Sequence, residues 1–222
     1  MQTVGDGDDR VLQLCVLAVE SLAVSGAGLS VSSGPGQHRK VAATDQVSDR
    51  VEDLQLLLGQ GPCVDALAKG APVLVDDLAD AAYERRWPMF TPAATAIGVR
   101  ASFSVPLVVG QLRLGAMDLY RSAAGPLDPP QVDEACDFAT AAVNLLLDQQ
   151  RSAADPLGPD RQGEPGSSVV YQATGMVIVQ LDTDAESAFA ALRARAYQEE
   201  RSLPDVARDV LERRVRLTDE EV

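Results

Sequence analysis

The stretch Val169–Gln180, VVYQATGMVIVQ, begins the part of the chain from which the whole organisation is best understood. Its apolar residues recur at helical spacing (i, i+3, i+7), so the stretch predicts a helix from about Val169 to Leu181. Gly175 lies inside this helix and allows another backbone to approach closely, because it has no side chain. We therefore expect a first helix whose start is polar and exposed.

Two more helices are predicted after it. The first is capped by Thr183, and Glu186 three residues later completes a capping box. The second is capped by Ser202, and Pro204 is tolerated in its first turn. Residues 169–217 therefore predict a small three-helix bundle, which is a size at which a domain is only marginally stable alone.

The region before the bundle divides into a linker and a full-size domain. Residues 151–168 hold several Pro and Gly and almost no large apolar residue, which predicts a flexible linker. Residues 8–150 predict an α+β domain with a mainly antiparallel sheet flanked by helices. The predicted helices are Asp8–Val24, Ser48–Leu58, Pro62–Leu67, Trp87–Ala96 and Pro129–Gln150, and the predicted strands are Ala27–Ser32, Val41–Thr44, Ala71–Val75, Ala101–Val109 and Gln111–Tyr120.

Composition limits the class of protein. Hydrophobic residues make up 46% of the chain and charged residues 23%, which is ordinary for a globular protein. No run approaches the roughly 18 apolar residues of a membrane helix, and the N-terminus lacks the layout of a signal peptide. The three cysteines are widely spaced and fit neither a disulfide framework nor a zinc pattern. We expect a cytoplasmic protein without a membrane partner.

The charge is unevenly distributed. Residues 168–217 hold 7 Arg and 8 Asp or Glu, whereas nearly all of the net charge of −14 lies elsewhere. The planar guanidinium group of Arg can donate two parallel hydrogen bonds to a phosphate group or to a base edge. However, a balanced set of charges also fits a solvated or dimerising helical face. Composition alone leaves RNA binding, DNA binding and protein pairing open.

Few residues of the first domain suggest chemistry. His38 is the only histidine, so neither a catalytic set that needs histidine nor a multi-histidine metal site can be built. Cys63 is a candidate ligand-attaching thiol, although no basic neighbour lowers its pKa and a structural thiol is favoured. Trp87 and Phe90 are scarce aromatics that form either a pocket wall or, as we favour, a packing anchor. We therefore expect no enzyme, no cofactor and no metal, and a weak candidate ligand pocket at these three residues.

The C-terminal residues resemble the ANTAR family, an RNA-binding antitermination module. The resemblance lies in QATGM (Gln172–Met176), AESAFAALRARA (Ala185–Ala196) and LPDVARDVL (Leu203–Leu211). One departure is Thr174, where many members of the family carry Lys, so that one phosphate contact is removed.

The resemblance implies an RNA-binding surface. Polar residues at the exposed start of the first helix fit this role, and the family match also places Arg193 on the RNA surface. Three further arginines are added for their charge. The residues that we predict to bind RNA are Gln172, Thr174, Gly175, Arg193, Arg195, Arg201 and Arg208.

The first domain is similar to the GAF domains that are joined to ANTAR modules in actinobacteria. The resemblance lies in LGQGPCVDAL (Leu58–Leu67), PVLVDDL (Pro72–Leu78), RWPMF (Arg86–Phe90), GVRASFSVPL (Gly98–Leu107) and LGAMDLYR (Leu114–Arg121). It implies a GAF-like fold that senses an unknown small-molecule ligand. The motifs of cyclic-nucleotide GAF domains are missing, and no Cys-His pair marks a bilin site.

Three hypotheses of function follow. The leading one is a signal-responsive regulator that binds paired RNA hairpins in nascent leader transcripts and promotes transcription antitermination. Two hairpins suit a homodimer, which we expect to form through Asp8–Val24 and Pro130–Gln150. The alternative is a non-enzymatic protein-interaction or dimerisation module with a ligand-sensing GAF domain. The third is a ligand-binding sensor whose output lies on another chain.

Overall fold

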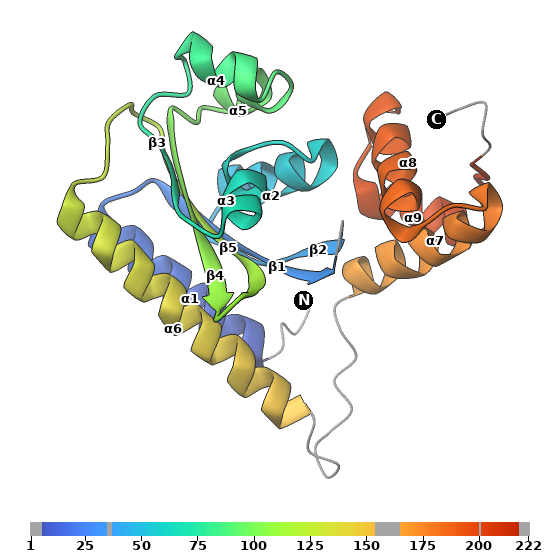
Figure 1. Ribbon diagram of the computed structural model, residues 1–222, viewed down its shortest axis with the longest axis horizontal. Helices are drawn as coiled ribbons and strands as arrows, with labels where there is room; N and C mark the ends of the chain where they lie inside the picture. The colour runs from blue at the N-terminus through green and yellow to red at the C-terminus, as the bar shows by residue number, and fades with distance from the viewer. Residues whose placement is uncertain (1–5, 35–36, 154–164, 200, 218–222) are drawn as a thin grey trace. The chain divides into compact units, whose positions relative to one another are not determined.

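The computed structural model describes residues 6–34, 37–153, 165–199 and 201–217. The chain divides into two compact units, an α+β unit that holds α1 to α6 and the sheet, and a helical unit that holds α7, α8 and α9 (Figure 1). In the described ranges, no helix is both long enough and apolar enough to cross a membrane.

The elements of the first unit follow the predicted order, with one addition. The predicted helix Trp87–Ala96 corresponds to α5, which begins three residues later at Phe90, and the short helix α4 before it was not predicted. Trp87 ends α4, and the residue before a proline, here Pro88, is disfavoured in helical conformation. The elements are α1 (Asp6–Leu22), β1 (Gly26–Gly34), β2 (Gln37–Ala43), α2 (Gln46–Leu58), α3 (Pro62–Lys69), β3 (Val73–Val75), α4 (Ala81–Arg86), α5 (Phe90–Ala96), β4 (Ala101–Val109), β5 (Leu112–Arg121) and α6 (Pro129–Ala153).

The strands form one sheet. Over the described residues it has five strands in the order β2-β1-β5-β4-β3. The pairs β1–β5, β3–β4 and β4–β5 are antiparallel, and a register shift interrupts β4 between Leu107 and Val108. The predicted α+β fold with an antiparallel sheet is therefore confirmed, including the β4–β5 hairpin.

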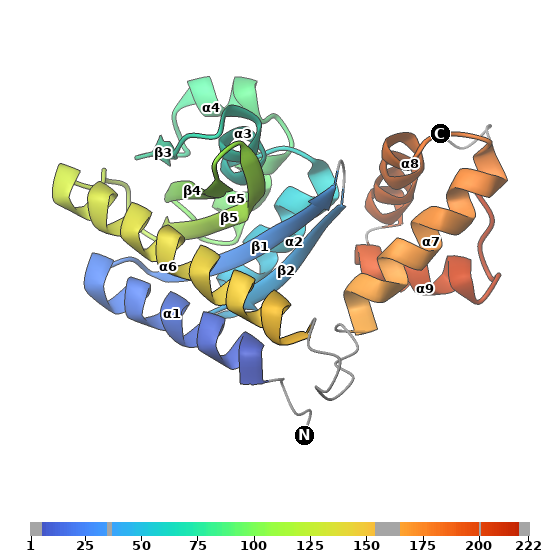
Figure 2. The same ribbon diagram turned by 60° about the horizontal axis from the view of Figure 1, so that its bottom comes forward.

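Helices cover both faces of the sheet. α1 and α6 lie side by side on one face, as both views show (Figures 1 and 2). The apolar side chains of α1 and α6 pack against every second residue of the strands and form the main core with them. The opposite face of the sheet is covered by α2, α3 and α5. The strand residues that face α1 and α6 include Leu29, Phe103, Val105, Leu107, Met117 and Leu119.

The polar strand residues that alternate with these apolar ones are also buried. Ser102, Ser104 and Asp118 are 4% exposed or less, and Tyr120 is 7% exposed. In a sheet with one solvated face such residues would point to water. Here they lie under the helices of the second face, which therefore encloses polar groups.

The second unit is a three-helix bundle of α7 (Pro165–Leu181), α8 (Ala185–Gln198) and α9 (Leu203–Leu211). The predicted cap Ser202 is confirmed, since its side chain accepts the Asp205 N–H. The predicted cap Thr183 is wrong: Asp184 caps α8 and accepts the Ser187 N–H at 2.8 Å. A carboxylate so placed also complements the positive end of the helix dipole.

The predicted linker, residues 151–168, falls mostly outside the described residues. α6 continues to Ala153 and α7 begins at Pro165, four residues before the predicted start of the first helix. Residues 154–164 between them are not described.

Candidate functional site

α7 buries one face and exposes another. Ala173 and Val177 are fully buried in the bundle, whereas Gln172 and Gly175 are exposed and Val179 is 81% exposed. We call Gln172, Gly175 and Val179 the open face of α7, because their spacing places them on one side of the helix. A Cβ atom added at Gly175 would meet nothing within 4 Å. Glycine inside a helix costs about 1 kcal/mol relative to alanine, and nothing in the described chain requires it here.

Thr174 is not part of this face, so the prediction that it lies at an exposed helix start is wrong. Its side chain is 3% exposed, and its hydroxyl donates to the Val170 carbonyl at 2.8 Å. Such a bond to the carbonyl four residues earlier satisfies a hydroxyl without solvent. The residue turns toward the bundle with Ala173, and it lies well inside α7.

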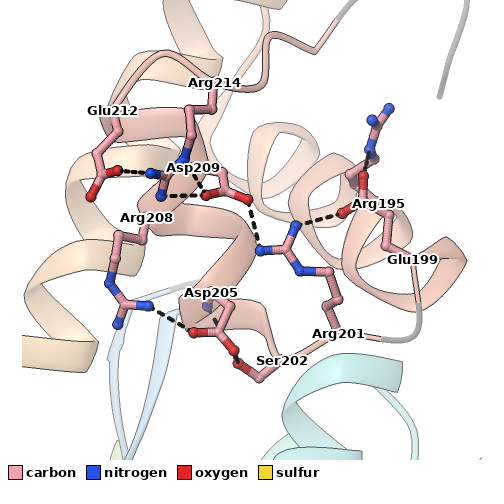
Figure 3. A network of polar contacts seen from close by, with 9 residues as sticks. All are labelled: Arg195, Glu199, Arg201, Ser202, Asp205, Arg208, Asp209, Glu212 and Arg214. Carbon is pink, nitrogen blue, oxygen red and sulfur yellow. Dashed lines mark hydrogen bonds and ion pairs between the residues drawn. The ribbon is translucent and has the colours of Figure 1, made fainter.

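Two of the predicted RNA-binding arginines belong to an ion-pair network at the end of α8 and along α9 (Figure 3). Arg195 Nε lies 2.5 Å from Glu199 Oε1, and Arg201 Nη1 lies 3.0 Å from the other Glu199 oxygen. Arg201 Nη2 also reaches Asp209 Oδ2 at 2.7 Å, and Arg214 Nη2 reaches Asp209 Oδ1 at 2.6 Å. Hydrogen bonds from Arg201 and then Arg214 hold the pKa of Asp209 below its ordinary value.

A third predicted arginine, Arg208, is paired in the same way. Its Nη1 lies 2.7 Å from Asp205 Oδ1, and the Ser202 hydroxyl donates to the other oxygen of that carboxylate (Figure 3). The hydrogen bond from Ser202, followed by that from Arg208, lowers the pKa of Asp205. A phosphate that binds these arginines must therefore compete with a carboxylate.

The remaining arginines of the second unit differ from these. The Arg193 guanidinium lies over the Phe189 ring, 5.3 Å from its centroid. Arg213 and Arg216 are exposed, and neither forms an ion pair among the described residues. The sequence-based prediction did not include these two. Both residues lie after the end of α9. The sequence did not show that they have no acidic partner there, because the partners of a charged side chain depend on how the bundle packs.

In the first unit, the strand register aligns a polar row across three strands. Asp118 of β5 pairs with Gly28 of β1 on one side and with Ser104 of β4 on the other. Glu52 of α2 lies above this row, and a Cβ atom added at Gly28 would be 2.4 Å from Glu52 Oε1. The absence of a side chain at Gly28 thus makes room for a carboxyl group.

Hydrogen bonds fix the Asp118 carboxylate. Ser104 donates to Oδ1, and Gln55 Nε2 donates to Oδ2 at 3.1 Å. The Gln55 amide is itself oriented by the Cys63 N–H, which donates to its oxygen at 2.7 Å. α2, α3, β4 and β5 therefore all contribute to one buried polar cluster.

The two carboxyl groups of this cluster favour holding a proton. Burial raises the pKa of Glu52 well above its ordinary value, and the Asp118 charge raises it further. Burial also raises the pKa of Asp118, although its hydrogen bonds act in the opposite direction. With Glu52 protonated and Asp118 ionised, the hydrogen bonds to Asp118 are retained and the cluster holds a single negative charge.

Of the three predicted pocket residues, Trp87 and Phe90 lie outside this polar cluster, whereas Cys63 borders it. Trp87 and Phe90 are 2% and 0% exposed and pack edge to face in one apolar cluster. Cys63 is 5% exposed, with its sulfur 3.8 Å from Ser30 Oγ, and burial raises the pKa of the thiol well above its ordinary value. A narrow depression that has no room for a water molecule is lined by Gly28, Ser48, Val51, Glu52, Asp118, Leu119 and Tyr120.

Sequence reasoning missed Glu52 and Asp118, although one signal was present. Asp118 interrupts an apolar strand, LGAMDLY, and Glu52 falls on the apolar side of α2 beside Val51. Acidic residues at positions that periodicity assigns to the interior are rare without a function.

The two units match two known domain families. A model of the GAF domain matches residues 8–146, and a model of the ANTAR domain matches residues 166–211. Because the first match covers more than half of the chain, the chain belongs to the GAF domain family, and an ANTAR domain follows its GAF domain. Both kinds of domain are regulatory, the first a sensor and the second an RNA-binding antitermination module. The comparison with curated proteins found no match.

Solved structures resemble the first unit. The GAF domain of a phosphoenolpyruvate-protein phosphotransferase from Coxiella burnetii is 15% identical, with a TM-score of 0.55, over 68% of this chain and 89% of that chain. The cyanobacteriochrome TePixJ GAF domain is 17% identical, with a TM-score of 0.50, over 68% of this chain and 98% of that chain. A GAF domain/HD domain protein from Geobacter sulfurreducens is 14% identical, with a TM-score of 0.50, over 66% and 95%. At these identities the likeness establishes the fold alone.

Proposed function

We propose that this chain is a signal-responsive, non-enzymatic regulator that binds paired hairpins in nascent transcripts and promotes transcription antitermination. The observation that supports this function most directly is the ANTAR match over residues 166–211, since ANTAR domains bind RNA. The GAF domain would sense the signal in a cytoplasmic, actinobacterial-type regulator.

The proposed RNA surface combines the open face of α7 with arginines of α8 and the α9 end. Gln172 offers an amide for base edges, and Gly175 offers backbone without an obstructing side chain. The Leu217 N–H donates to Gln180 Oε1 at 3.1 Å, so the segment with Arg216 returns to the end of α7. Arg213 and Arg193 complete the set.

The paired arginines make a smaller proposed contribution. Arg195, Arg201 and Arg208 keep further N–H donors, because each guanidinium has five. Their carboxylate partners already neutralise much of their charge. A phosphate therefore gains less at these three than at Arg213 or Arg216.

We also propose that the protein is a homodimer. α1 exposes Val16 at 41% and Leu17 at 54% beside α6. Burying these apolar side chains between two copies would be favourable. In sedimentation, Leu17→Glu should convert a dimer into a monomer, whereas Glu20→Gln on the same helix should leave its mass unchanged. A monomeric unmodified protein would contradict this proposal.

The test of RNA binding is a gel shift with genomic leader RNAs at near-physiological salt. Replacing Arg216 by Ala should weaken binding about three- to tenfold and reduce the salt dependence by about one phosphate contact. Arg85→Ala is the matched control, because Arg85 is an exposed arginine of the first unit. Arg193→Ala tests Arg193, which we propose as a residue that contacts RNA.

One observation favours the alternative function. The net charge of −14 repels nucleic acid, and the ion-pair network reduces the positive charge of the second unit. If no leader RNA is retarded, the bundle is better explained as a protein-interaction or dimerisation module. Pull-down of a defined partner that the Val179→Glu variant fails to capture would then support that explanation.

A further inference from the structure

The ion-pair network of the second unit contains as many carboxylates as arginines. Its charged members are Arg195, Arg201, Arg208, Arg214, Glu199, Asp205, Asp209 and Glu212 (Figure 3). The four positive and four negative charges sum to zero. This surface therefore attracts a polyanion weakly, although it is rich in the side chain that binds phosphate in the best geometry.

Asp209 holds two of these arginines at once. Its Oδ2 lies 2.7 Å from Arg201 Nη2, and its Oδ1 lies 2.8 Å from Arg214 Nε and 2.6 Å from Arg214 Nη2. Further carboxylates bind the same guanidinium groups, because Arg201 Nη1 lies 3.0 Å from Glu199 and Arg214 Nη1 binds Glu212. A phosphate that approaches either arginine must therefore compete with a carboxylate on both sides.

Main-chain bonds close the turn after α9 without help from this carboxylate. The Arg214 N–H donates to the Asp209 carbonyl at 2.8 Å, and the Arg213 N–H donates to the Val210 carbonyl at 3.1 Å. This is the Schellman pattern of a helix end, with Arg213 in the left-handed conformation at a φ of 59°. Leu217 is buried and anchors the segment that follows. Ion pairs with exposed arginines contribute little to stability, so the Asp209 carboxylate matters more for charge than for folding.

The arginines on either side of Arg214 are placed differently. Arg213 and Arg216 are exposed, and neither forms an ion pair within the described ranges. One short segment thus alternates a neutralised guanidinium group with two that carboxylates do not neutralise. An RNA that reaches it meets positive charge at particular positions only, which favours an RNA whose phosphates match those positions.

We propose that Asp209 sets the RNA selectivity of the second unit by keeping Arg201 and Arg214 from the phosphates of unrelated RNA. This inference rests on the proposed RNA-binding function. Leader RNA is held by the open face of α7, Arg213 and Arg216, and contacts to base edges fix its register. Unrelated RNA is held by charge alone and can shift to any arginine that is not neutralised. Asp209 is thus a positioning residue, because it acts through two arginines.

The experiment uses the full-length protein and two probes. One is a leader RNA that the protein retards in the gel shift with genomic leader RNAs, and the other is an RNA duplex of unrelated sequence. In Asp209→Asn, affinity for the duplex should rise about three- to fivefold and affinity for the leader RNA by less than about twofold. The duplex affinity should also depend more steeply on salt, by about one phosphate contact. A merely structural role of Asp209 would instead weaken binding to both RNAs.

Two further variants separate pairing from net charge. Asp182→Asn removes the same charge from an exposed residue of the second unit that forms no ion pair within the described ranges, so it should leave the selectivity unchanged. Glu212→Gln releases only one nitrogen of Arg214 and should lower the selectivity by a smaller amount than Asp209→Asn. If Asp209→Asn does not fold, Glu212→Gln makes the same comparison at an exposed position.

Three results overturn the inference while leader RNA is still retarded, so that the proposed function stands. Asp209→Asn and Glu212→Gln bind both RNAs as the unmodified protein does, or they bind both more weakly, or Asp182→Asn lowers the selectivity as much as Asp209→Asn. If neither RNA is retarded at any salt concentration, the proposed function and this inference both fail.

Discussion

The two units hold their carboxylates in opposite surroundings. In the first unit, Glu52 and Asp118 are buried against a sheet, and neither forms an ion pair with a lysine or arginine within the described ranges. In the second unit, Asp209 lies between Arg201 and Arg214 at the surface. A buried, unpaired acid makes its domain sensitive to protonation, whereas an exposed ion pair makes its domain sensitive to salt.

The same contrast applies to glycine. The position of a Gly28 side chain is already occupied by the Glu52 carboxyl, whereas the position of a Gly175 side chain is open. One glycine serves a contact inside the domain. The other serves none within the described chain, which is what a surface for an external partner requires.

The largest effect is expected from Gly28→Ala. The new methyl group would lie 2.4 Å from Glu52 Oε1 and 2.9 Å from its Cγ, so the buried Glu52 side chain must shift, and the unfolding free energy should fall by about 1–3 kcal/mol. Denaturant unfolding measures it. In a Glu52→Ala background the cost should drop below about 1 kcal/mol; an equal cost in both backgrounds would show that the carboxyl is not what Gly28 accommodates.

A second prediction concerns the opposite pH responses of the two units. The raised pKa of Glu52 gives a stabilisation that is full below the unfolded-state pKa and is lost as the pH rises through the folded-state pKa. The first unit should therefore become more stable as the pH falls from 8 to 5, and the Glu52→Gln variant should lack this gain. Trp87, the only tryptophan, reports its unfolding by fluorescence.

The acids of the second unit should respond in the other sense. Their lowered pKa values give a stabilisation that is present above the unfolded-state pKa and is lost as the pH falls through the folded-state pKa. The protection factors of the α9 amides should therefore fall only below about pH 4. A parallel response of both units to acid would show that the contrast between them is wrong.

A third and smaller effect is expected from Gly175→Ala. Because no atom lies within 4 Å of the new methyl group, the variant should be more stable by about 0.5–1 kcal/mol, the difference in helix propensity. RNA binding should weaken at the same time if the open face of α7 contacts RNA. Thermal unfolding and gel shift of the same preparation test both effects, and Val179→Ala on the same face is the companion variant.

The smallest effect is expected from Arg208→Ala. The Arg208–Asp205 pair is about half exposed at both ends, so its loss should cost less than about 0.5 kcal/mol. This small loss should vanish in 1 M salt. A loss above about 1 kcal/mol that persists at high salt would mean that the network stabilises the bundle in a way that surface ion pairs do not.

Part of the proposed RNA-binding surface could be predicted from the sequence. Helical spacing and caps predicted the bundle, and the residues at Gln172 and Gly175 were correctly expected to be exposed. The prediction that Thr174 is exposed was wrong, because a shift of one residue along a helix turns the side chain by about 100°. Which side of α7 is open depends on where α8 and α9 pack.

The amino-acid sequence by itself determined the kind and order of most elements, because apolar periodicity, caps and turn glycines act over a few neighbouring residues. Only the tertiary structure decided that the polar side of the strands is also buried, since that depends on α2 and α3 closing over it. It likewise decided that Glu52 meets Asp118, 66 positions later in the sequence, and that Arg201 meets Asp209 while Arg216 remains unpaired. Charges interact through space, and their partners are set by packing rather than by spacing along the chain.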